Sequence, residues 1–170
     1  FQDTRLFKES LLENIRAARP EASRDEVLAA AHAAQCDDIL EKLPQGLDTV
    51  VGTKGVYLSG GEQQRIALAR AMLKNAPIVV LDEATAFADP ENEHQIQKAF
   101  EALTRNKTVL MIAHRLSTVQ DADNIIVLSD GKIAEQGNHR DLLQKNGVYA
   151  AMWADYQRSA QWKVGKEAAV

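Results

Sequence analysis

The sequence predicts an α/β fold with a mostly parallel sheet, and three observations support this class. Continuous apolar runs at Ile78–Leu81, Thr108–Ala113 and Ile125–Leu128 are typical of strands covered on both faces. A helical pattern between the first two runs gives a strand–helix–strand unit with an expected right-handed crossover. The 170 residues are 45% hydrophobic and 26% charged, which permits a buried core in one domain, or in one domain and part of another.

Charge and hydropathy exclude several classes of protein. Twenty Lys and Arg residues against 24 Asp and Glu residues give a net charge of −4, which excludes a generally basic nucleic-acid-binding protein. No apolar run approaches the roughly 18 residues of a membrane span. Cys36 is the single cysteine and lies in an Ala-rich helical stretch, so we expect it to be buried. Because the chain opens with FQDTRLFKES, we expect it to be a piece of a longer protein.

The N-terminal part reads as helical. Ser23 and Glu26 form one expected capping box, and Ser59 and Glu62 form a second, which starts a helix that Pro77 ends. A shorter helix is expected around residues 11–15. Residues 43–57 read as loop because they contain one proline and three glycines.

The C-terminal part continues the α/β pattern. Asp89 is the expected cap of a helix whose first residue is Pro90. Asp130-Gly131 predicts a hairpin turn. Asn138 is the expected cap of a short helix, and residues 148–163 form an amphipathic one.

Polar residues with chemical potential follow two of the strands. Asp82 and Glu83 come directly after Ile78–Leu81, where ligands of open α/β sheets bind. One carboxylate can hold Mg²⁺ while the other polarises a water molecule; a polar strand terminus is the simpler alternative. His114 ends the second strand and is positioned for a phosphate or a water, or is a partly exposed loop histidine.

The segment Ser59-Gly60-Gly61 opens a helix without large side chains. Bare backbone N–H groups, the helix dipole and the serine hydroxyl suit an anion, although an ordinary helix cap explains the same residues. Gln2 can supply a neutral oxygen ligand to a metal.

Together these residues closely resemble the ATP-binding-cassette (ABC) ATPases over residues 1–150. The resemblance rests on Gln2, LSGGEQQR (58–65), IVVLDEAT (78–85), Asp89 and His114, in that order. It implies an α/β, RecA-like P-loop NTPase core carrying the ABC helical subdomain. Residues 1–76 would be the Q-loop and helical subdomain, 77–150 the second half of the core, and 151–170 a C-terminal helix and tail.

The resemblance also implies the site. Glu83 would be the general base and His114 the switch histidine, both catalytic. Asp82 and Gln2 would hold Mg²⁺. The residues implied to contact ATP are Gln2, Ser59, Gly60, Gly61, Glu62 and Asp89.

A phosphate-binding G-x-x-x-x-G-K-[ST] loop is absent from the sequence. The resemblance places this loop before residue 1, so we expect the chain to be truncated and inactive alone. In the intact protein it implies an ATPase, with ATP and Mg²⁺, that powers transport at the cytoplasmic face of a membrane. The implied partners are a second nucleotide-binding domain, arranged head to tail, and a transmembrane domain fused upstream; no nucleic acid is implied.

The subtype resembles exporters. The loop 48–55 is similar to the exporter X-loop, although Val50 and Thr53 stand where Glu is usual. The transported molecule could be a drug, a lipid or, from the wording AFADPENE (86–93), a siderophore or iron complex. Two alternatives remain: a non-transport ABC ATPase, which would often show coiled-coil heptads or basic patches, and a non-catalytic paralogue, which would be expected to lose Glu83, His114 or a signature glycine.

Overall fold

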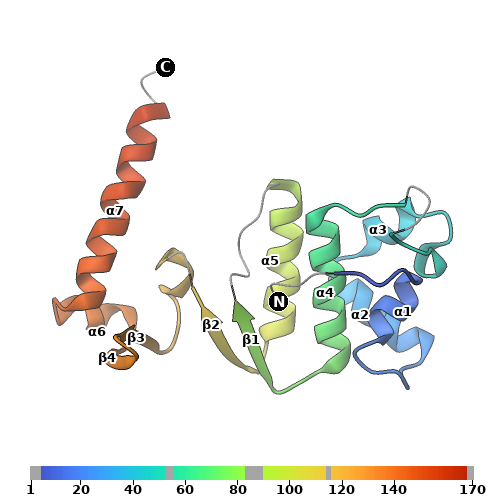
Figure 1. Cartoon of the computed structure of the whole chain (residues 1–170), viewed down its shortest axis with the longest axis horizontal. Helices are drawn as coiled ribbons and strands as arrows, with labels where there is room; N and C mark the ends of the chain where they lie inside the picture. The colour runs from blue at the N-terminus through green and yellow to red at the C-terminus, as the bar shows by residue number, and fades with distance from the viewer. Residues whose placement is uncertain (1–4, 53–55, 83–89, 114–115, 168–170) are drawn as a thin grey trace. The chain divides into compact units, whose positions relative to one another are not determined.

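The computed structural model describes residues 5–52, 56–82, 90–113 and 116–167 (Figure 1). The chain divides into two compact units, Phe1–Ile112 and Ala113–Val170. In the first unit the elements are α1 (Leu11–Arg16), α2 (Arg24–Ala33), α3 (Asp37–Lys42), the 3₁₀ turn η1 (Gly46–Asp48), α4 (Gly60–Lys74), β1 (Ile78–Asp82), α5 (Pro90–Thr104) and β2 (Thr108–Ile112). In the second they are η2 (Leu116–Val119), β3 (Ile125–Ser129), β4 (Lys132–Gly137), α6 (His139–Gln144) and α7 (Val148–Glu167).

Helices α1, α2 and α4 of the first unit begin at side-chain caps. The capping box of α2 is present at Ser23 and Glu26, and Ser10 caps α1. These helices pack with α4 around a core that includes Leu11, Ile15 and Ile66, each fully buried. The capping prediction is confirmed because the local hydrogen bonds of a helix start depend on residues only three positions apart.

Strands β1 and β2 pair in parallel, and α5 is the connection between them in the sequence. Their register places Asp82 opposite Ile112. Helices α4 and α5 contact each other, and the core they share buries Val79 and Leu81 of β1. The parallel strand–helix–strand unit is therefore confirmed.

One expectation for this sheet is wrong for the structure as described. The apolar runs predicted strands covered on both faces, yet Ile78 and Val80 are 60% and 52% exposed. Every residue of β2 is also exposed. The helices cover the Val79–Leu81 side, whereas Ile78 and Val80, on the other side, stay exposed among the described residues of this unit. The second apolar face of these strands is therefore not buried within the first unit.

The second unit is a hairpin with two helices. Asp130 and Gly131 have φ values of 49° and 73°, which suits the tight turn between β3 and β4. Asn138 caps α6 through the backbone N–H of Asp141. Glu135 of β4 accepts hydrogen bonds from two backbone N–H groups at the start of α7.

Among the described helices, none combines the length and the apolar character that crossing a membrane requires.

Candidate signature-loop site

We call Leu58–Glu62 the signature loop; it contains the start of α4. The Ser59 hydroxyl oxygen accepts a hydrogen bond from the Glu62 N–H at 3.2 Å, and Glu62 Oε2 accepts one from the Ser59 N–H at 2.6 Å. The carbonyl of Leu58 accepts a hydrogen bond from the Gln63 side chain at 2.8 Å. Because its hydroxyl oxygen serves as the acceptor, the Ser59 proton remains able to donate to a ligand. The loop is thus held by its own residues while Ser59 stays exposed.

The two glycines of the loop have different surroundings. A Cβ atom built on Gly60 would meet nothing within 4 Å. A Cβ atom on Gly61 would lie 2.7 Å from both Cβ and Cγ of Asn92 in α5. Packing against α5 therefore requires glycine at position 61, whereas the open side of Gly60 leaves its backbone approachable. A nucleotide contact by either glycine stays a prediction.

Glu62 combines a structural role with a buried charge. It is 7% exposed, and its Oε1 accepts a hydrogen bond from Lys42 Nζ at 2.9 Å. Burial opposes ionisation of this carboxyl group, but hydrogen bonds from Lys42 and Ser59 outweigh burial and lower its pKa. Glu62 is therefore an ion at neutral pH, one residue beyond the two glycines.

Arg65, one turn into α4, joins three segments of the first unit. It is 1% exposed, and both of its terminal nitrogens donate to Asp38 at 2.6 and 2.8 Å. It also donates to the Gln35 carbonyl and, at 3.2 Å, to the Asn92 side chain. The hydrogen bonds from Arg65 to the Asp38 carboxylate lower the pKa of Asp38. Such a bidentate pair fixes the rotation of α4 and hence the direction in which its N-terminus points.

Asp82 lies at the carboxyl end of β1 and is partly buried. A single carboxylate there fits Mg²⁺, which prefers oxygen ligands and keeps several waters. No group of three or more His, Cys, Asp or Glu side chains suited to a metal ion occurs among the residues that the structure describes.

Four predicted site residues lie outside the described residues, so the structure does not test their positions: Gln2, Glu83, Asp89 and His114. Of the predicted set, Ser59, Gly60, Gly61 and Glu62 are brought together by the start of α4.

Sequence reasoning missed three residues that contact this site. Lys42 meets Glu62 from α3, Asn92 meets Gly61 and Arg65 from α5, and Asp38 meets Arg65. The presence of Glu62 and Arg65 in a mostly apolar helix face was the available signal, because buried charges require partners. Sequence alone does not say which partners they find.

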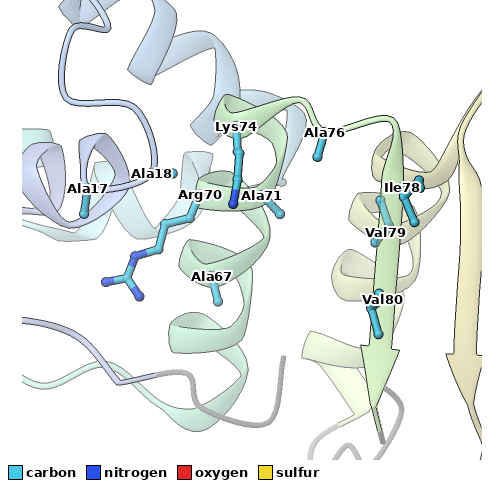
Figure 2. Close-up of a pocket in the computed structure, with 10 residues that line it drawn as sticks. All are labelled: Ala17, Ala18, Ala67, Arg70, Ala71, Lys74, Ala76, Ile78, Val79 and Val80. Atoms are coloured by element: carbon cyan, nitrogen blue, oxygen red, sulfur yellow. The ribbon is translucent and has the colours of Figure 1, made fainter.

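A pocket of about 450 Å³ lies elsewhere in the first unit, beside the C-terminal half of α4 (Figure 2). Apart from Arg70 and Lys74 its lining is small and apolar: Ala17, Ala18, Ala67, Ala71, Ala76, Ile78, Val79 and Val80. Ser59 and Gly60 do not line it, so this pocket is separate from the signature loop.

The first unit has the features of an α/β nucleotide-hydrolysing domain: a parallel βαβ unit, a carboxylate at the end of β1 and a glycine-rich start of α4. A family model described as ABC transporter matches residues 1–86 of the 170. The chain belongs to the ABC transporter family.

The chain is similar in sequence and structure to ABC exporters. An ATP-dependent lipid A-core flippase from Haemophilus influenzae is 49% identical over 154 residues, which is 90% of this chain and 26% of the flippase. The ABC transporter ATM1 from Toxoplasma gondii is 50% identical over 161 residues, 94% of this chain and 14% of that protein. The solved structure of a bacterial Atm1-family ABC exporter with ATP bound is 49% identical with a TM-score of 0.77, covering 91% of this chain and 27% of that chain. The chain therefore spans about a quarter or less of the length of these relatives.

Proposed function

We propose that this chain is part of the nucleotide-binding domain of an ABC exporter and contributes to ATP hydrolysis that drives transport. The observation that carries the proposal is the signature loop: Ser59 is fixed by its capping box, and Gly60 has open space where a side chain would be. This arrangement suits the terminal phosphate of ATP at the positive end of α4. The similarity to exporters over about 90% of the chain supports the same function.

In this proposal the signature loop serves the ATP held by a second nucleotide-binding domain, arranged head to tail. Asp82 and Gln2 hold Mg²⁺, which neutralises phosphate charge when bound. Glu83 accepts a proton from the attacking water, His114 contacts the terminal phosphate, and Asp89 lies in the segment facing the partner domain. A transmembrane domain fused upstream places the chain at the cytoplasmic face of the membrane.

The catalytic part of the proposal is tested by Glu83→Gln in the full-length protein. This variant should still bind ATP but hydrolyse it about 10²–10⁴-fold more slowly, because it lacks the general base. Glu93→Gln, in α5, is a matched control of the same chemistry outside the site. Turnover of Glu83→Gln within a factor of about two of wild type would contradict the assignment.

The head-to-tail part is tested with Gly60→Asp in one chain of a mixed dimer. The new carboxylate should impair the ATP site whose phosphate loop belongs to the other chain, because like charges repel. Site-specific photolabelling with an azido-ATP identifies the affected site. Loss at the phosphate loop of the mutated chain itself would refute the composite site.

A further inference from the structure

Lys42 and Glu62 form an ion pair at the signature loop. Both carboxylate oxygens of Glu62 are engaged: Oε1 accepts from Lys42 Nζ at 2.9 Å and Oε2 accepts from the Ser59 N–H at 2.6 Å. The second hydrogen bond ties the carboxylate to the residue that precedes Gly60. Glu62 thus places a fixed negative charge at the helix terminus that the proposed function assigns to a polyphosphate.

This charge opposes the binding of a polyanion. The start of α4 favours negative groups, but a buried carboxylate a few ångströms from the binding backbone repels a second anion. Lys42 donates a hydrogen bond to this carboxylate, and its side chain is 62% exposed. The nearby Arg65 is committed to the bidentate pair with Asp38, so its charge is already matched.

We propose that Lys42 is a positioning residue of the signature-loop site: its ammonium group neutralises Glu62 and so allows a nucleoside triphosphate to approach Ser59 and Gly60. The inference rests on the proposed function and deepens it. Lys42 acts through Glu62 and takes no part in the chemical step. Its effect therefore falls on nucleotide affinity and depends on ionic strength.

The test uses the full-length protein and measures KM for Mg-ATP and kcat. Lys42→Gln should raise KM about three- to tenfold, with kcat changed by less than about twofold, because it leaves Glu62 unneutralised. The increase should shrink between about 0.05 M and about 0.5 M salt. Lys42→Arg retains the charge and should keep KM close to wild type. Lys74→Gln removes a lysine from the opposite end of α4 and is the matched control.

The double variant Lys42→Gln/Glu62→Gln separates charge neutralisation from a structural role. Removing the carboxylate as well should lower KM from the Lys42→Gln value most of the way to the wild-type value. An unchanged KM in Lys42→Gln, or a defect that persists in the double variant, would overturn the inference. Gly60→Asp in the same assay distinguishes the two failures: if it impairs turnover while Lys42→Gln does not, the inference alone is wrong, and if neither has an effect, the proposed function fails.

Discussion

Alanine substitutions at the two neighbouring glycines of the signature loop should have different effects on stability. The Cβ atom of Gly61→Ala would lie 2.7 Å from Cβ and Cγ of Asn92 and 3.1 Å from its Nδ2. Overpacking of this kind costs about 1–3 kcal/mol, and replacing glycine by alanine in a helix returns up to about 1 kcal/mol. Gly61→Ala should therefore destabilise the first unit by about 1–2 kcal/mol. Gly60→Ala meets nothing within 4 Å and should be neutral or slightly stabilising.

Urea unfolding of the 170-residue chain, followed by far-UV circular dichroism, measures this difference. Amide hydrogen exchange in α4 confirms that the change lies in the first unit. Asn92→Gly removes the three atoms nearest to the new methyl group, but it also removes a helical side chain and its hydrogen bond with Arg65, so it should cost less stability in the Gly61→Ala background than in wild type. The reasoning is refuted if Gly61→Ala is as stable as Gly60→Ala, or if Asn92→Gly costs the same in both backgrounds.

Three further predictions concern other parts of the chain. Cys36 is fully buried and burial raises its pKa to about 12, so iodoacetamide at neutral pH should label it in urea but not in the native chain. Asp38→Asn should lower the free energy of unfolding at pH 7 by about 1–3 kcal/mol because Arg65 loses an ionic acceptor. Arg65 lowers the pKa of Asp38, so this stabilisation is present at neutral pH and is lost as pH falls through the folded-state pKa. The urea midpoints of variant and wild type should therefore converge in acid. Gly147→Ala should weaken α7 by about 1–2 kcal/mol, because the new Cβ would overlap Glu135 Oε1 and displace the carboxylate that caps this helix. Hydrogen exchange at the first turn of α7 measures the change, and unchanged exchange would contradict this role of Glu135.

The features that sequence predicts well are local in the chain. The capping boxes at Ser23 and Ser59, the turn at Asp130-Gly131 and the cap at Asn138 all appear as expected. Each depends on hydrogen bonds or backbone preferences within about four residues. The parallel pairing of β1 with β2 also follows, because a strand–helix–strand connection of this length favours it.

The partners of the buried charges are not local. Lys42 reaches Glu62 across 20 positions, and Asp38 and Asn92 each reach Arg65 across 27. Many charged residues of suitable sign occur in the chain, and the packing of α3, α4 and α5 selects among them. The candidate site is therefore predictable as a motif, whereas the residues that hold the motif in place are not.

The sequence by itself determines the class of this protein, because LSGGEQQR and IVVLDEAT are contiguous motifs and the chemistry of each can be inferred from its own residues. It does not separate Gly60 from Gly61, which are identical in sequence and adjacent. Only the tertiary structure decides that one faces open space and the other faces Asn92, since the difference arises from the contact between α4 and α5. The same holds for the sheet: the apolar runs specify strands, and the packing of helices on one side decides that Val79 is buried while Val80 is exposed.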